Sequence, residues 1–127
     1  HKGMENACRA LRPGGSILHF AECPNGSGLR AIEDFLWRYD TYEAMEKALR
    51  QEFVVGGHKA YWLARLGHEY DVRLVSTLDP ALVARCGFRP VRPEAYGACL
   101  NELLARLPSS ARVGAVPRSG FTLPVLV

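Results

Sequence analysis

The sequence predicts a three-layer α/β fold, in which an open and largely parallel sheet carries helices on both faces. Three observations indicate this fold class. Short apolar runs alternate along the chain with longer segments that repeat apolar residues every three or four positions. Breaks rich in glycine and proline separate the two kinds of segment. The chain has 127 residues, of which 48% are hydrophobic, which is enough for one domain with its own core.

The first half of the chain predicts helices around a single strand. Residues 2–11 repeat apolar residues at helical spacing, and Pro13-Gly14-Gly15 ends this helix. The run 17–21 is apolar without alternation, which is typical of a strand buried on both faces of a parallel sheet. Three helices are expected next: one carrying Ile32, Phe35 and Leu36, one capped by Asp40 or Thr41 and broken by Gly56-Gly57, and one over residues 58–69.

The second half continues the alternation. Residues 72–78 predict a second strand, and Asp79-Pro80 begins a short helix because aspartate caps free N–H groups and proline suits the first helical position. That helix is expected to end at Gly87. The remaining expectations are an extended piece at 88–91, a helix at 93–107, a third strand at 113–116 and an edge strand at 122–127 that contains Pro124. This order indicates a Rossmann-like sheet with right-handed crossovers.

Composition excludes several classes of function. The net charge is only +3 and the basic residues are scattered, so nucleic-acid binding is not expected. No stretch approaches about 18 consecutive apolar residues, so no membrane span is expected. The four cysteines form no C-x-x-C pair, which argues against a zinc knuckle and indicates free thiols of a cytoplasmic protein.

The chain opens with His1-Lys2, without an initiator methionine, and the residues from Met4 to Leu11 already have the pattern of a helix. This helix lacks a start signal. The simplest interpretation is that residues 1–127 form a single domain excised from a larger protein, and that a preceding strand and loop lie outside this sequence.

Ligands of open α/β sheets bind at the carboxyl ends of the strands. This rule selects the loop Glu22–Gly28 after the first strand and the turn Arg118–Gly120. Helix amino ends usually lie at the same edge, which adds Lys2 and the segment Gly56–Lys59. We therefore expect four separate pieces to converge on one edge, with Glu22, Cys23, Gly26, Gly28, Gly57 and Lys59 lining a cleft.

Each candidate residue also has a plainer interpretation. The segment from Gly56 to Lys59 offers free N–H donors and positive charge to an anion, or it is a flexible link whose His58 is solvated. Lys2 at a helix start marks a carboxylate site, or it reflects truncation or cloning. Cys23 is a reactive thiol in a glycine-rich loop, or a small buried hydrophobic residue, and Gly26-Ser27-Gly28 lacks the third glycine of a dinucleotide fingerprint.

Six motifs occur in a fixed order: Lys2-Gly3-Met4, Arg12-Pro13-Gly14-Gly15, Ala21-Glu22-Cys23-Pro24-Asn25-Gly26-Ser27-Gly28, Phe53-Val54-Val55-Gly56-Gly57-His58-Lys59-Ala60-Tyr61, Leu63-Ala64-Arg65 and Thr122-Leu123-Pro124-Val125. Together they resemble the carboxy-terminal domain of the nickel-dependent lactate racemase family. The resemblance covers nearly the whole chain and implies a carboxy-terminal fragment of a two-domain protein.

The resemblance implies a 2-hydroxyacid racemase or epimerase that acts by hydride transfer. In that family a nickel-pincer nucleotide is tethered to a lysine of the amino-terminal domain, and histidines of that same domain ligate the nickel and act as acid and base. This chain would then hold no catalytic residue and no metal ligand, and would be inactive without its amino-terminal domain.

The resemblance also assigns substrate contacts. Lys2 matches the lysine of a Gln-x-x-Lys motif that opens the domain and helps to hold a small 2-hydroxy acid. His58 matches a wall position that is tryptophan in lactate racemase itself, which implies a larger or more polar substrate. The alternative is a non-catalytic relative that keeps the fold as a ligand-binding or interaction domain.

Overall fold

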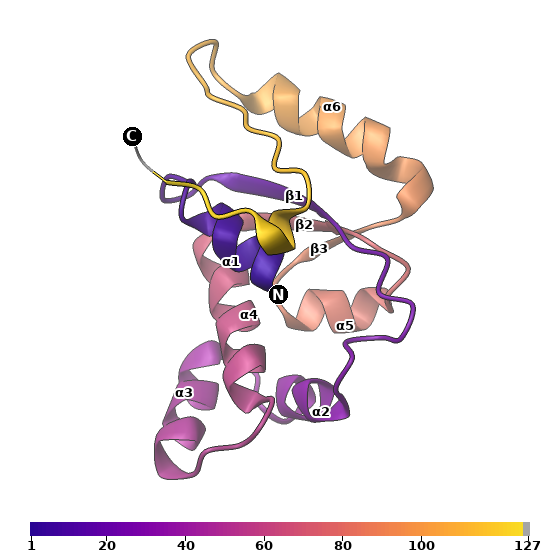
Figure 1. Cartoon of the computed structure of the whole chain (residues 1–127). Helices are drawn as coiled ribbons and strands as arrows, with labels where there is room; N and C mark the ends of the chain where they lie inside the picture. Colours follow the sequence, from indigo (N-terminus) through magenta and orange to yellow (C-terminus); the bar gives the residue numbers. More distant parts are fainter. Residues whose placement is uncertain (126–127) are drawn as a thin grey trace.

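The structure is a computed structural model that describes residues 1–125 (Figure 1). Its elements are α1 (Lys2–Cys8), β1 (Ser16–Phe20), α2 (Arg30–Arg38), α3 (Tyr42–Gln51), α4 (Gly57–Glu69), β2 (Asp71–Val75), α5 (Pro80–Arg85), β3 (Arg89–Val91), α6 (Tyr96–Arg106) and the 3₁₀ turns η1 (Pro93–Ala95) and η2 (Ser119–Phe121). None of the helices within this range is long and apolar enough to cross a membrane.

The three strands form an open parallel sheet in the order β1-β2-β3. The open parallel sheet agrees with the prediction from the sequence, which did not specify the strand order. Ile17 of β1 is paired with Val72 of β2, and Leu74 of β2 with Pro90 of β3. One further hydrogen bond extends the β1–β2 ladder, from the Ala21 amide to the Val75 carbonyl at 3.0 Å. The central strand β2 is therefore buried between two neighbours, which explains its apolar sequence.

Helices cover both faces of the sheet, which confirms the three-layer prediction. Figure 1 shows α6 on one side of the sheet and α1, α4 and α5 on the other, with α2 and α3 farther out. Val72 and Leu74 point into one core cluster together with Met4 of α1, Leu66 of α4 and Val83 of α5. That cluster continues outward into the α2–α3 pair through Phe35, Leu36 and Met45.

Two predicted caps are present. The Thr41 hydroxyl accepts from the Ala44 amide at 3.2 Å, so Thr41 rather than Asp40 caps α3. The Asp79 carboxylate accepts from the Ala81 amide at 2.9 Å, and Pro80 is the first residue of α5, as expected. These bonds satisfy backbone N–H groups that a helix leaves free at its amino end.

The glycine of the last turn of α4 permits a close backbone contact. A β-carbon at Gly67 would lie 2.9 Å from Gly87 Cα and would also collide with the Cys86 carbonyl oxygen. Gly87 itself has φ +73°, a left-handed conformation that favours glycine. Helix α4 therefore packs directly on the backbone turn that links α5 to β3.

Helix α6 is attached to the sheet by charge more than by apolar contact. Arg73 of β2 is 2% exposed, and its guanidinium donates to Glu102 of α6 at 3.0 Å and to Asp71 at 3.4 Å. Asp71 also pairs with Arg89 of β3 at 3.2 Å. On the helix, Leu103 is buried, whereas Leu104 is 44% exposed, and Leu107, directly after the helix, is 39% exposed. Helix α6 therefore makes little apolar contact with the sheet.

The predicted third strand at 113–116 is wrong: this segment has no regular structure. The third strand is the short extended piece at Arg89–Val91. Residues 113–116 are largely exposed, so their apolar side chains do not reflect burial in a sheet. The predicted last strand is likewise absent over residues 122–125, and its final residues, 126 and 127, lie outside the described part of the chain.

Replacing Gly67 by alanine is expected to lower the free energy of unfolding by about 1–3 kcal/mol, because the added β-carbon must push α4 away from the Cys86–Gly87 backbone. Urea denaturation of the purified chain measures this change. The matched control is Gly97→Ala in α6, where nothing lies within 4 Å of the new β-carbon. There the better helix propensity of alanine is expected to leave stability unchanged or raise it by up to about 1 kcal/mol. Equal losses in both variants would contradict the packing argument.

The attachment of α6 is expected to weaken in acid. The Arg73 hydrogen bond, followed by the charges of Arg106 and Arg73, lowers the pKa of Glu102 below its ordinary value of 4.5. A carboxylate whose pKa is depressed in the folded state adds stability above the unfolded pKa and loses it as the pH falls. Stability measured by urea denaturation should therefore decrease as the pH falls below 4.5, and Glu102→Gln should flatten this part of the profile. An unchanged profile in Glu102→Gln would refute the role of this pair.

Candidate functional site

The loop after β1 is held at the carboxyl edge of the sheet by the neighbouring loop. The Thr77 hydroxyl, which follows β2, donates to the Glu22 carbonyl at 3.1 Å. Cys23 has φ 53°, which is unusual for a residue with a side chain, and Gly26 and Gly28 also have positive φ. This loop therefore turns sharply as it leaves the sheet, and its course depends on the two glycines.

The amino end of α4 lies directly against α2 because two glycines allow it. Gly56 has φ +91°, and a β-carbon there would lie 3.1 Å from the Leu29 side chain and 3.3 Å from the Ile32 amide. Gly57 is buried, and a β-carbon there would lie 3.0 Å from the Phe35 ring. The first turn of α4 is thus placed next to the start of α2, which is itself the continuation of the Glu22–Gly28 loop.

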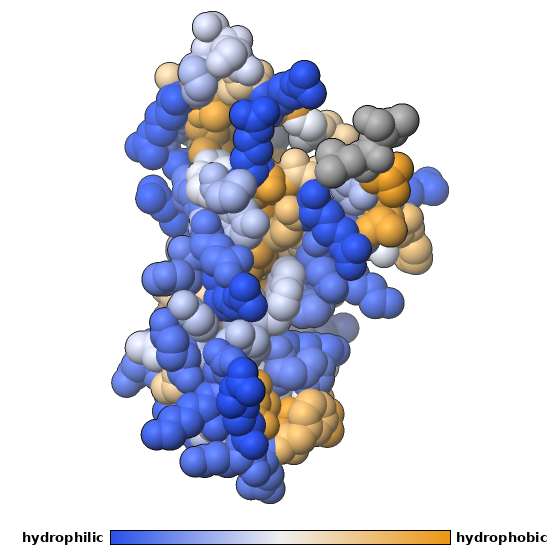
Figure 2. All heavy atoms as spheres, turned by 90° about the vertical axis from the view of Figure 1, so that its left-hand side faces the viewer, coloured by the Kyte–Doolittle hydropathy of each residue, from blue (hydrophilic) through white to orange (hydrophobic). Residues whose placement is uncertain are grey.

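His58 and Lys59 project from this first turn, and both are exposed. The His58 ring stacks on Phe53, with ring centroids 5.5 Å apart and an interplanar angle of 18°. Phe53 is 69% exposed and Val55 67%, so apolar surface flanks the imidazole. Figure 2 shows hydrophobic atoms at the lower end of the molecule, the end at which Figure 1 places α2, α3 and the start of α4.

Helix α1 begins at Lys2, as predicted, and its start lies near both of the preceding segments. Burial lowers the pKa of the His1 amino group, while the nearby charge of Cys23 raises it and that of Lys59 lowers it. The His1 ring lies 4.6 Å from the Trp62 ring of α4. The start of α1, the loop after β1 and the first turns of α4 are therefore close neighbours.

The turn at 118–120 also packs on α1. The Asn6 side chain donates to the Ser119 carbonyl at 3.0 Å, and a β-carbon at Gly3 would collide with the Ser119 hydroxyl. The same β-carbon would lie 3.1 Å from the His19 ring. Burial, and secondly the His1 amino group, lowers the pKa of His19, in line with a packed histidine rather than a ligand.

The start of α1 thus has the loop after β1, the first turns of α4 and the turn at 118–120 as neighbours. Lys2 is exposed, and the side chains of Lys2, His58 and Lys59 make no hydrogen bond or ion pair with residues 1–125. The backbone carbonyl of Glu22 accepts the hydrogen bond from Thr77, and Cys23 is half-buried. Chemically, the region offers two ammonium groups and one imidazole, which suits an anionic ligand.

The side chains of the described residues do not form a metal centre. Among residues 1–125, no group of three His, Cys, Asp or Glu side chains is close enough to hold a metal ion. Burial raises the pKa of the Cys8 thiol to about 11 and that of Cys86 to about 12, which makes both thiols poor ligands at neutral pH.

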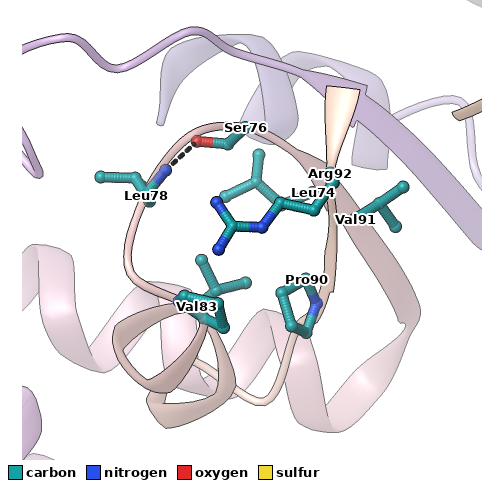
Figure 3. Close-up of a pocket in the computed structure, with 8 residues that line it drawn as sticks. Leu74, Ser76, Leu78, Val83, Pro90, Val91 and Arg92 are labelled. Atoms are coloured by element: carbon teal, nitrogen blue, oxygen red, sulfur yellow. Dashed lines mark hydrogen bonds between the residues drawn. The ribbon is translucent and has the colours of Figure 1, made fainter. Parts of the chain in front are cut away.

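A second feature at the same edge was not predicted. A cavity of about 90 Å³ lies where β2 and β3 end, and Ser76 and Arg92 are its polar lining residues (Figure 3). The edge rule that selected the loop after β1 applies equally to the loop after β2. The sequence offers no signal for the cavity itself, because Arg92 reaches it only through the pairing of β3 with β2.

Comparisons with known proteins give one informative result. The chain matches no protein-family model and no curated protein. Among solved structures it matches the lactate racemase apoprotein from Thermoanaerobacterium thermosaccharolyticum, with a TM-score of 0.67 and 25% sequence identity over 82% of this chain. The chain is similar to a lactate racemase.

The similarity to the racemase supports the family resemblance drawn from the six motifs. The match covers 26% of the racemase chain, so this sequence spans about a quarter of that protein's length. The shared part is the α/β arrangement described above.

Two glycine substitutions are expected to separate backbone strain from crowding at the site. Gly28 and Gly56 both have positive φ, so alanine should cost about 1 kcal/mol of unfolding free energy at either position. Only Gly56 is crowded by α2, so Gly56→Ala should cost about 1 kcal/mol more than Gly28→Ala, which has open space around it. Paired urea denaturation curves measure the difference. If Gly28→Ala proves the more damaging, the close contact between α4 and α2 is not as described.

Proposed function

We propose that this domain is the substrate-side half of a nickel-pincer-dependent 2-hydroxyacid racemase or epimerase, and that it is inactive without an amino-terminal domain. The similarity to the lactate racemase apoprotein carries the proposal. The convergence of α1, the loop after β1 and the start of α4 supports it, because these segments carry the residues that the resemblance assigns to the substrate.

Lys2 is proposed to pair with the substrate carboxylate. Its ammonium group is exposed at the first residue of α1 and has no partner among residues 1–125, so it is free to bind an anion. A charge-assisted hydrogen bond of this kind both holds and orients a carboxylate.

His58 is proposed to contact the hydroxyl or side chain of the substrate. Its ring is held against Phe53 by stacking, which limits its orientation, and the residue remains exposed. A polar imidazole at this wall favours a 2-hydroxy acid that is larger or more polar than lactate.

The cofactor is proposed to belong to the amino-terminal domain. The described residues of this chain do not fit a nickel site, because they provide no cluster of three ligating side chains. When bound, the nickel-pincer nucleotide supplies the hydride acceptor. The part of this chain is to bind the substrate, to orient it and to close the cleft from the opposite side.

The test joins this domain to the amino-terminal region that the proposal requires, loads the protein with the cofactor, and measures exchange of the α-hydrogen of 2-hydroxy acids. Lys2→Ala is expected to lower kcat/KM about 10- to 100-fold through loss of a charge-assisted hydrogen bond, and His58→Ala about tenfold. Calorimetric binding of the same acids should weaken in parallel.

Lys47→Ala and His68→Ala are the matched controls, because both residues are exposed and lie away from the site, on α3 and at the far end of α4. Full activity in both site variants would refute the proposed roles. Ligand binding without any hydrogen exchange by the joined protein would favour the alternative, a non-catalytic binding domain.

A further inference from the structure

The cavity at the ends of β2 and β3 is built as an apolar pocket with a polar mouth. Leu74, Val83 and Pro90 form its walls, and the loop that follows β2 arches over it (Figure 3). Leu74 is 6% exposed and Val83 3%, so the walls belong to the buried interior. With a volume of about 90 Å³, the cavity has room for only a small ligand of a few heavy atoms.

Ser76 brings a hydroxyl to this pocket whose proton has no acceptor among the described residues. The residue is 5% exposed, and its Oγ accepts a hydrogen bond from the Leu78 amide at 3.0 Å. Within residues 1–125, no hydrogen bond uses this hydroxyl as a donor. A buried donor without an acceptor costs free energy, so Ser76 is suited to a ligand that accepts a hydrogen bond.

Arg92 supplies a second donor at the mouth. Figure 3 shows its side chain extending from the end of β3 across the cavity, toward Leu78 and Val83. Arg92 forms no ion pair or side-chain hydrogen bond with the described residues, whereas Arg89 pairs with Asp71 and Arg85 pairs with Asp40. No aspartate or glutamate of the described chain lines the cavity, so the guanidinium lacks a counter-ion there.

We propose that this cavity binds short-chain aliphatic carboxylates. The carboxylate lies between the Arg92 guanidinium and the Ser76 hydroxyl, and the alkyl part lies among Leu74, Val83 and Pro90. Two convergent donors without an acceptor select an anion, and the apolar walls select a short hydrocarbon chain.

This site is distinct from the one that contains Lys2 and His58. The two share the carboxyl edge of the sheet and are linked by the bond from Thr77 to the Glu22 carbonyl. The carboxylate pocket requires neither the cofactor nor an amino-terminal domain, because its lining residues all lie between positions 74 and 92. It can therefore be tested on the 127-residue chain, and its failure would leave the proposed function standing.

Titration of the ¹⁵N- and methyl-labelled chain with propionate, followed by nuclear magnetic resonance, tests the proposal. We expect saturable shifts of the Ser76 and Leu78 amides and the Val83 methyls, with a Kd that is roughly millimolar because Arg92 is exposed to water. Arg92→Gln is expected to weaken binding about tenfold through loss of a charge-assisted hydrogen bond. Arg112→Gln, at an exposed arginine outside the pocket, should leave the Kd unchanged.

Two further ligands separate the contributions to binding. Formate keeps the charge without the alkyl group, and propionamide keeps the shape without the charge, so both should bind more weakly than propionate. Non-saturable shifts, equal binding of formate and propionate, or an unchanged Kd in Arg92→Gln would each overturn the proposal.

Discussion

Helix α4 is fixed in position by backbone contacts at both of its ends, and the other elements are arranged around it. Gly57 permits its first turn to touch Phe35 of α2, and Gly67 permits its last turn to lie on the Cys86–Gly87 backbone. A side chain at either glycine would hold these surfaces apart. Because β2 follows α4 directly, the same constraint places the central strand, and with it both loops at the carboxyl edge of the sheet.

Different interactions stabilise the two faces of β2. Val72 and Leu74 point into the apolar core that α1, α4 and α5 complete, where burial of hydrocarbon supplies the stability. Arg73, between them, points to the opposite face, where it meets Asp71 and Glu102. Its Nε atom is buried and has no partner among the described residues.

Local sequence signals predicted most of the fold, because caps and breaks depend on near neighbours. Asp79-Pro80 and Gly56-Gly57 mark the starts of α5 and α4, and Pro13-Gly14-Gly15 directly precedes β1. The predicted helix over residues 2–11 is shorter than expected, because α1 ends at Cys8. The prediction of a strand at 113–116 was wrong because strand formation depends on distant partners. The apolar side chains of this segment imply burial, but no strand of the described chain pairs with it. The strand at Arg89–Val91 was expected only as an extended piece, since three residues that include a proline give a weak pattern.

The sequence predicted which segments form the candidate site, but it did not predict the contacts between their side chains. The rule for strand ends selected the loop after β1, and glycines selected the start of α4, but the stacking of His58 on Phe53 depends on how α3 turns into α4. The contact between α4 and the α5–β3 turn was also beyond prediction, because Gly67 sits within a helical pattern like any small residue. Arg92 and Ser76 meet only after β3 pairs with β2.

The two outer edges of the sheet differ in their capacity to accept another strand. The Val91 carbonyl accepts from the Ser76 amide, so Val91 directs its backbone toward β2, and the alternation along a strand directs that of Pro90 outward. Proline has no N–H to donate, and β3 is only three residues long. Edge-to-edge association is thus blocked beside β3, whereas β1 presents an outer row of amides and carbonyls uninterrupted by proline over Ser16–Phe20.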